Sequence, residues 1–352
     1  MEPTLRYARA SDGVTIAYTS VGSGPALVWL PPVPFSNVIG QWRVPSVHDA
    51  YQRLATRLQL ILYDGRGTGH SQRDVDDLGL DAMLRDLDAV VGHARLQRFA
   101  LLGYYHSVPA AIAYAARHPQ RVSRLVLFGG STRALDSMSA PETQALLTLI
   151  ERDWDLFVDS AAHAWMGWSA GKEGRLVADA FRSATTPAIA RATLEAAREM
   201  DVSTEARLVT APALVLHRQG ERQMPLEVSQ RLAEALPDGR MLRLEGTTAG
   251  LFFGDMGADL KVLLDFLTDE PGAGPAAASE VRPTGTELPA GLTARELEVL
   301  RLVAQGETNA EIAHRLELSV HTVERHAANL YRKIGARGRA DATAYAVRRG
   351  IV

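Results

Sequence analysis

The residues of this chain whose types could do chemistry are gathered in one short turn, Gly103-Tyr104-Tyr105-His106-Ser107. An apolar run, Phe99–Leu102, precedes the turn, and a helical stretch beginning at Val108 follows it. A sharp turn between a strand and a helix presents a nucleophile when it reads Gly-x-Ser-x-Gly. Here Tyr105 holds the serine position, and a phenol with a pKa of about 10 attacks a substrate only with help from a base.

Ser107 offers a second register for a nucleophile in the same turn. That register places Pro109 where the motif has a small residue, and it leaves Gly103 without a role. We therefore favour Tyr105 as the residue at the nucleophile position and keep Ser107 as the alternative.

Alternating strands and helices would position this turn. Apolar runs are typical of strands buried on both faces, and their alternation with helices predicts an α/β fold with a parallel sheet. Residues 133–205 interrupt the alternation with helical sequence, which predicts a cap carrying Trp154, Trp165 and Trp168. Strands are expected at Ala26–Leu30, Leu58–Tyr63, Phe99–Leu102, Leu125–Phe128, Ala213–His217 and Arg240–Leu244, and helices at Asp81–Arg95 and Val108–Arg117.

The composition changes sharply after residue 269. Residues 270–290 are rich in Pro, Gly, Ala, Ser and Thr and predict a linker. It separates a body, residues 1–269, from a tail, residues 291–352. The whole chain carries a net charge of −3, yet the tail holds ten Lys and Arg against seven Asp and Glu. A basic tail on an acidic body predicts that the tail meets a polyanion.

The composition also excludes several classes of protein. The absence of cysteine rules out disulfides, a thiol nucleophile and Cys-ligated zinc, and it fits a reducing cytoplasm. No apolar run is long enough for a transmembrane helix, and the N-terminus does not resemble a signal peptide, so no membrane association is expected. No motif calls for a metal or a cofactor.

Four segments of the body, in the right order, resemble the α/β-hydrolase family. Besides the turn at Tyr105 they are 63-YDGRGTGHS-71, 216-LHRQGERQMP-225 and 245-EGTTAGLFFGD-255. The resemblance implies an α/β-hydrolase fold with a helical cap, an acid position at Glu221 and a histidine position at Ala249. A methyl group cannot transfer a proton, so the general base is missing. Prolines around Val33, in Pro31-Pro32-Val33-Pro34, also remove N–H donors from the expected oxyanion loop.

Two interpretations of this degenerate triad remain. In the first, the pocket has decayed and Tyr105 fills the void. In the second, which we favour, the pocket binds a small-molecule effector without turnover. Its expected ligand-binding residues are Tyr105, Tyr104, His106, Val33, Trp154, Trp165, Trp168 and Phe252.

The tail predicts an all-α domain of four helices. Capping boxes at Thr293/Glu296 and Thr308/Glu311 begin two of them, and Gly306 ends the first. A third helix after Ser319 is expected to bury Val320, Val323, Ala327, Leu330 and Ile334, and a fourth to run from about Arg339 to Arg349. A short helix, a tight turn and a longer helix form a helix-turn-helix.

The tail resembles the LuxR/GerE-type DNA-binding domain from Leu292 to Ala342. The matching residues include Thr293, Glu296, Gly306, Asn309, Ile312, Val323, His326 and Gly335. The resemblance implies double-stranded DNA as partner, the third helix in the major groove, and a homodimer formed through the Ala342, Tyr345 and Ala346 face. The expected DNA-binding residues are Ser319, His321, Thr322, Glu324, Arg325, Ala328, Asn329, Arg332 and Lys333, with Arg337 and Arg339 as further phosphate contacts.

Together these observations favour a cytoplasmic, DNA-binding transcription regulator with a non-catalytic sensor body. An active or slow hydrolase fused to a DNA-binding domain is the alternative. A third hypothesis is a body that only dimerises, joined to a constitutive DNA-binding tail.

Overall fold

The structure is a computed structural model, and it separates into two compact units, Met1–Glu270 and Pro271–Val352. It describes residues 3–134, 141–166, 171–220, 224–246, 248–251, 256–268, 294–316, 320–334, 336 and 338–348. Each unit is considered by itself.

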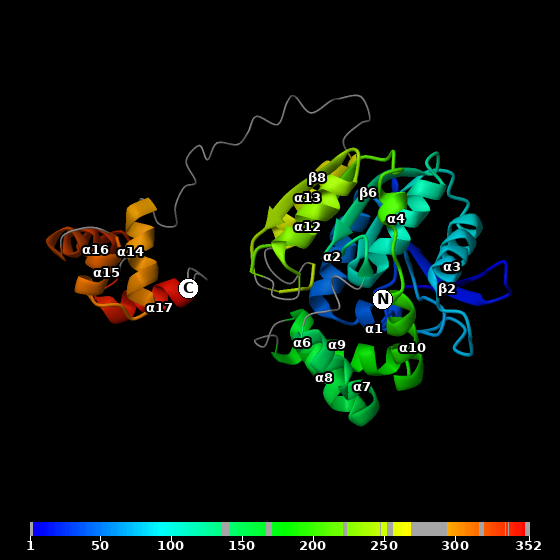
Figure 1. Ribbon diagram of the computed structural model, residues 1–352, viewed down its shortest axis with the longest axis horizontal. Helices are drawn as coiled ribbons and strands as arrows, with labels where there is room; N and C mark the ends of the chain where they lie inside the picture. The colour runs from blue at the N-terminus through cyan, green and yellow to red at the C-terminus, as the bar shows by residue number, and fades with distance from the viewer. Residues whose placement is uncertain are drawn as a thin grey trace. The chain divides into compact units, whose positions relative to one another are not determined.

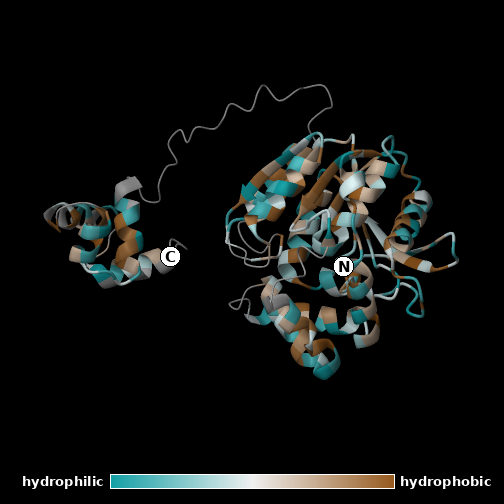
Figure 2. Ribbon diagram, in the orientation of Figure 1, coloured by the Kyte–Doolittle hydropathy of each residue, from teal (hydrophilic) through white to brown (hydrophobic). Residues whose placement is uncertain are grey.

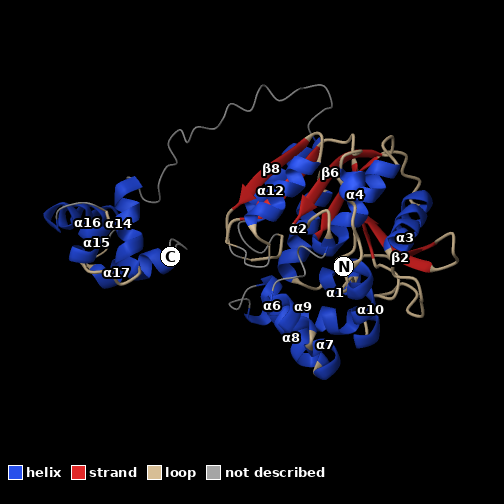
Figure 3. Cartoon of the chain, in the orientation of Figure 1, coloured by secondary structure: helices blue, strands red, loops and turns tan. Residues whose placement is uncertain are grey.

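The first unit is built on one sheet, whose described strands run in the order β1-β2-β4-β3-β5-β6-β7-β8 (Figure 3). From β4 to β8 neighbouring strands pair in parallel, while β1 and β2 pair antiparallel at one edge. The strands are β1 (Arg6–Arg9), β2 (Thr15–Val21), β3 (Ala26–Trp29), β4 (Gln59–Tyr63), β5 (Phe99–Tyr104), β6 (Val122–Phe128), β7 (Ala213–Arg218) and β8 (Gly239–Leu244).

The six strands expected from apolar runs are confirmed, and β1 and β2 were missed. β1 is the edge strand and buries only Ala8, whereas β2 lies between β1 and β4 and mixes Thr and Ser with its apolar residues. Such strands show no continuous apolar run, so the signal used for the central strands could not detect them.

Helices cover both faces of this sheet. Consecutive strand residues point to opposite faces, so Ile61 packs in the core with α3 and α4, whereas Leu60 packs in the core with α2 and α13. Hydrophobic residues predominate along the central strands (Figure 2). The helices outside the cap are α1 (Val38–Trp42), α2 (Pro45–Ala55), α3 (Leu80–His93), α4 (Val108–Arg117), α12 (Leu226–Ala235) and α13 (Met256–Thr268), with the 3-10 turn η1 at Tyr105–Ser107.

The expected helical cap is present between β6 and β7, below the sheet in Figure 1. Its two ends are joined, because the Ala134 amide donates to the Met200 carbonyl and the Val202 amide to the Thr132 carbonyl. The cap therefore begins and ends at one place on the sheet, as an insertion must. Its described helices are α6 (Pro141–Leu147), α7 (Leu149–Arg152), α8 (Trp154–Met166), α9 (Gly171–Ala184), α10 (Pro187–Arg198) and α11 (Ser203–Ala206).

The second unit has the four expected helices around a core of its own. The Thr308/Glu311 capping box forms as predicted, and Gly306 has a positive φ of 93° after the first helix. Two details were wrong. Val320 is 44% exposed, because it is the first residue of its helix, and the face of Ala342 and Ala346 is fully buried. The helices are α14 (Ala294–Ala304), α15 (Asn309–Arg315), α16 (Val320–Ile334) and α17 (Arg339–Arg348).

Two of the three residues of the expected dimer face, Ala342 and Ala346, are fully buried. Both lie in the core of the second unit, where α17 packs against α14, and Tyr345 is partly buried beside them. Only Tyr345 could then contribute to a dimer through this face, and the homodimer stays a prediction.

Candidate functional site

The turn after β5 retains the backbone of a nucleophile elbow. Tyr105 has a φ of 48°, a left-handed conformation that is uncommon for a bulky residue and costs on the order of 1–3 kcal/mol. The Tyr105 ring fits against Gly129, where an added Cβ would approach the ring to 2.7 Å. Side-chain packing thus accommodates a tyrosine at a position where the family motif has serine.

Gly103 and Ser107 have structural roles in this turn. A Cβ on Gly103 would lie 2.8 Å from the Ala111 side chain, so the glycine permits close packing of α4 on β5. Ser107 is fully buried; its Oγ accepts from the Tyr104 amide at 2.9 Å and donates to the Tyr104 carbonyl at 3.0 Å. These contacts argue against the alternative register, because the hydroxyl of Ser107 is sealed from any substrate.

Ala249, the residue at the predicted histidine position, is enclosed by its neighbours. Ala249 is 1% exposed, and its carbonyl accepts a hydrogen bond of 2.8 Å from the Tyr104 hydroxyl. The neighbouring Gly250 amide donates to the Trp165 carbonyl at 2.9 Å, which ties this loop to the end of cap helix α8. A methyl group surrounded in this way can supply no proton transfer.

Arg218, at the end of β7, also binds the loop that carries Ala249. Its fully buried guanidinium pairs with Asp259 of α13 at 2.7 Å and donates to the Glu245 and Gly250 carbonyls. It also lies over the ring of Phe128. This clamp was not predicted, although an arginine ending an apolar strand is the signal that could have revealed it. The acid position, Glu221, lies outside the described residues.

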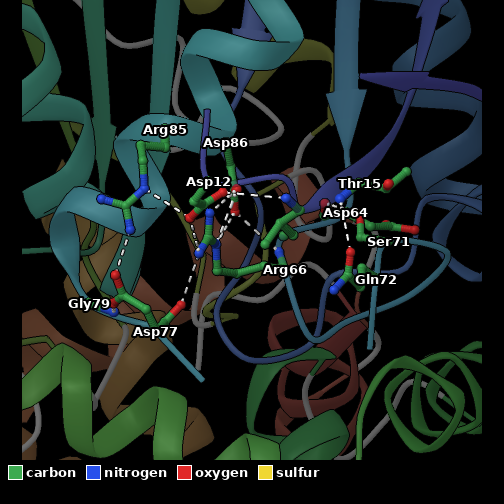
Figure 4. A network of polar contacts seen from close by, with 12 residues as sticks. Asp12, Thr15, Asp64, Arg66, Ser71, Gln72, Asp77, Gly79, Arg85 and Asp86 are labelled. Carbon is green, nitrogen blue, oxygen red and sulfur yellow. Dashed lines mark hydrogen bonds and ion pairs between the residues drawn. The ribbon is translucent and has the colours of Figure 1, made fainter. Parts of the chain in front are cut away.

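The turn after β4 is held by a second buried network, drawn in Figure 4. Arg66 pairs with Asp86 of α3 at 2.8 Å and with Asp12 at 2.9 Å. Burial raises the pKa of Asp12, but hydrogen bonds from Arg66 and Arg85 outweigh it and lower that pKa to about 2. These ion pairs anchor the turn, and Arg66 and Asp86 also line a small cavity of about 30 Å³ that reaches Thr193 of cap helix α10.

A cavity of about 180 Å³ lies between Tyr105 and the cap. Its polar wall is His106, whose Nδ1 is sealed from solvent and has no hydrogen-bond partner among the described residues. Burial alone lowers the pKa of His106 to about 4, so the ring is neutral near pH 7. A second, smaller cavity of about 60 Å³ lies on the other side of Trp165.

The structure brings together part of the expected ligand site. Tyr105, His106, Val33 and Trp165 line the larger cavity, whereas Tyr104 lines the smaller one. Trp154 packs against Phe35 and Phe157 in the cap core and lines neither of these cavities, so its ligand role stays a prediction that they do not support. Trp168 and Phe252 lie outside the described residues. The lining residues that were missed are Pro34, Phe35, Leu146, Leu147, Phe157, Ala161, Ala164 and Leu194.

Two residues of the second unit that were expected to contact DNA phosphates contact groups inside the unit instead. The Lys333 ammonium lies 2.6 Å from the buried carboxylate of Glu296 in α14, and Arg339 donates to the Val303 and Glu307 carbonyls. The phosphate contact of Lys333 stays a prediction, with a competing partner inside the unit. Thr322 and Asn329 lie on described parts of α16. Ser319 and the side chains of His321, Glu324, Arg325, Ala328 and Arg332 lie outside the described residues.

Comparison with known proteins matches both units to families. The model described as "Bacterial regulatory proteins, luxR family" matches residues 290–346, and the model described as "alpha/beta hydrolase fold" matches residues 41–176. The chain joins an α/β-hydrolase domain to a LuxR-type domain. Among the described residues we find no group of three acidic or histidine side chains that could hold a metal, and no helix suited to crossing a membrane.

Individual relatives divide in the same way between the α/β-hydrolase domain and the LuxR-type domain. "Putative carbamate hydrolase RutD" of Caulobacter sp. is 26% identical over 66% of this chain and 82% of that protein. "Response regulator RamR" of Streptomyces coelicolor is 55% identical to the tail, over 16% of this chain and 28% of that protein. An esterase structure from Exiguobacterium antarcticum, 20% identical, covers 76% of this chain and all of its own with a TM-score of 0.67, which shows the shared fold.

Proposed function

We propose that this protein is a DNA-binding transcription regulator whose α/β-hydrolase domain binds a small molecule without hydrolysing it. The observation that carries the proposal is Ala249. At the place where a hydrolase of this fold has its general base, a buried methyl group is packed and its carbonyl is engaged by Tyr104. Without that base neither Tyr105 nor a water is activated.

A retained cavity supports binding in place of catalysis. The space under the cap is bounded by Tyr105, His106 and Trp165, and burial lowers the pKa of His106 to about 4, so the ring that lines it is neutral near pH 7. The LuxR-type tail supplies an output for such binding, since a domain of this type implies DNA as partner. A ligand acts as a switch only if it binds two states of the protein unequally.

A path from the cavity toward the linker also supports the proposal. Trp165 lines the cavity, its carbonyl accepts from Gly250, and Arg218 connects the Gly250 carbonyl to Asp259. Asp259 belongs to α13, the last described helix before residue 269. A shift of Trp165 on ligand binding would therefore reach the element that leads into the linker.

A slow hydrolase is the second candidate, favoured by relatives named as hydrolases and by the retained left-handed turn at Tyr105. The two are separated by incubating the full chain with p-nitrophenyl acetate and butyrate. We expect no burst and no turnover above a Tyr105→Phe control. Tyr105→Ser should stay inactive, because Ala249 still offers no base. Turnover that disappears in Tyr105→Phe would overturn the non-catalytic proposal.

The sensing half of the proposal is tested by DNA binding. The affinity of the full chain for its operator, selected from a random DNA library, is measured with and without a small-molecule extract of the native host. We expect the extract to change the dissociation constant of the full chain and to leave an isolated tail, residues 291–352, unaffected. An equal response of both proteins, or of neither, would contradict a sensor in the hydrolase domain.

A further inference from the structure

The walls of the larger cavity restrict the charge of its ligand. The described residues that line it include no Asp, Glu, Lys or Arg. A carboxylate or an ammonium placed there would lose its hydration without gaining an ion pair, which costs several kcal/mol. An uncharged ligand avoids that cost.

The volume of the cavity restricts the size of the ligand. An apolar cavity of about 150 Å³ holds a benzene molecule, and this one measures about 180 Å³. A body of one substituted ring, or a branched chain of similar bulk, therefore fits. Phe35, Phe157 and Trp165 offer aromatic walls for such a body.

The polar requirement comes from His106. Its ring lines the cavity, and its Nδ1 is sealed without a partner among the described residues. Because an orphaned buried N–H is rarer than an orphaned acceptor, we assign the proton of the neutral ring to Nε2. Because Nδ1 is sealed, Nε2 is the ring nitrogen that a ligand in the cavity can reach. With the proton on Nε2 this group is a donor, and its complement is an acceptor such as a carbonyl oxygen.

We propose that this cavity binds a compact, uncharged carbonyl compound with an aromatic or branched aliphatic body, whose oxygen accepts a hydrogen bond from His106. The inference rests on the proposed sensing function and specifies its ligand. Tyr105 and Trp165 form walls beside the ligand, and Trp165 connects it to the loop at Gly250.

Three probes of similar size test the class by calorimetric titration of the full chain. Acetophenone carries the carbonyl, ethylbenzene lacks it, and benzoate adds a charge. We expect acetophenone to bind about tenfold more tightly than ethylbenzene, the value of one buried hydrogen bond, and benzoate not to bind. Equal binding of acetophenone and ethylbenzene, preference for benzoate, or no binding by any probe would overturn the proposal.

Variants of His106 assign the preference to this residue. His106→Leu should bind acetophenone and ethylbenzene alike, whereas His106→Gln, whose amide can donate, should restore part of the difference. His163→Leu is the matched control, since His163 lies on cap helix α8, contacts the Asp159 carbonyl and is not among the lining residues. Persistence of the full preference in His106→Leu would show that another group binds the oxygen.

The same measurements keep this inference separate from the proposed function. If the host extract changes DNA affinity while the three probes fail to bind, the ligand class is wrong and sensing stands. If acetophenone binds with the expected preference while the extract leaves DNA affinity unchanged, the ligand class stands and the sensing function fails.

Discussion

Tyr105 and Ala249 differ in what they keep of the hydrolase motif: Tyr105 keeps the backbone conformation, and Ala249 lacks the expected side chain. The backbone at Tyr105 keeps a strained left-handed conformation, yet its ring is packed on Gly129 and is only 7% exposed. Ala249 replaces a proton-transfer group by a methyl group and lets Tyr104 bind its carbonyl. At the scale of residues, the turn keeps a backbone suited to a nucleophile, while the proposed loss of a general base at Ala249 would leave that nucleophile without activation.

The titration of His106 should appear in the stability of the hydrolase domain. Burial lowers its pKa from 6.5 to about 4, so between these values the unfolded chain binds a proton that the folded chain does not. Stability is therefore lost as the pH falls through that window, by up to about 3 kcal/mol. Urea unfolding from pH 7 to 4 should show a shallower loss in His106→Gln. An unchanged pH profile in this variant would mean that His106 is solvated in the folded protein.

Substitutions on α16 should separate base recognition from backbone contact. Arg325→Ala should weaken binding at one base pair by about 1–3 kcal/mol and relax specificity there. Lys333→Ala should weaken all sequences alike, and it should also remove the ion pair between Lys333 and the buried Glu296. Operator-variant titrations at several salt concentrations measure the DNA effects. Wild-type affinity in both variants would mean that α16 does not enter the major groove.

At the scale of elements, β7 and α13 are coupled through one buried ion pair. Arg218 and Asp259 have side-chain exposures of 0% and 2%, and the arginine also binds the backbone of the loop that carries Ala249. The loop is thus held by hydrogen bonds from Arg218 to its carbonyls and by the hydrogen bond from Gly250 to the Trp165 carbonyl of α8. The cap, the loop that carries Ala249 and helix α13 are therefore connected through buried hydrogen bonds and one ion pair.

Arg218→Met should destabilise the hydrolase domain by about 3–5 kcal/mol, because it removes the charged partner of the buried Asp259 carboxylate. Arg53→Met is the control: the Arg53–Asp49 pair is exposed, with side-chain exposures of 58% and 49%, and its loss should cost less than about 1 kcal/mol. Urea unfolding monitored by tryptophan fluorescence measures both. Adding Asp259→Leu to Arg218→Met should recover stability, and a further loss would show that Asp259 has another essential partner.

At the scale of the whole molecule, the two units have separate cores. Leu330 and Val323 lie in the core of the LuxR-type domain, whereas the sheet and cap of the hydrolase domain have their own clusters. Each unit buries its apolar surface within itself, so each should fold as a cooperative unit.

Calorimetry of the full chain should therefore resolve two transitions. Leu330→Ala should lower only the midpoint of the LuxR-type domain, by the cost of a buried cavity, about 2–5 kcal/mol. Arg218→Met should lower only the midpoint of the hydrolase domain. A single transition that both substitutions shift would show that the two units unfold together.

Local patterns predicted much of this architecture. Apolar runs located β3 to β7, a partly apolar segment located β8, and the residues of one capping box located the start of α15. They succeeded because both features depend on residues close together in the sequence. A strand buried on both faces needs consecutive apolar residues, and a capping box needs two residues three positions apart. Strands β1 and β2 failed the same test, because polar residues interrupt the apolar residues in both.

The sequence by itself determined the order of the central strands and the helices around them, the division into two units and the residue types at Tyr105 and Ala249 on which the non-catalytic proposal rests. Only the tertiary structure decided that Arg218 meets Asp259, that Ser107 is sealed, and that the Ala342 face is internal. It also decided the cavity, whose lining runs from Val33 to Leu194. The physical reason is distance along the chain: packing joins residues that no local pattern relates, and burial then decides which side chain can meet a ligand.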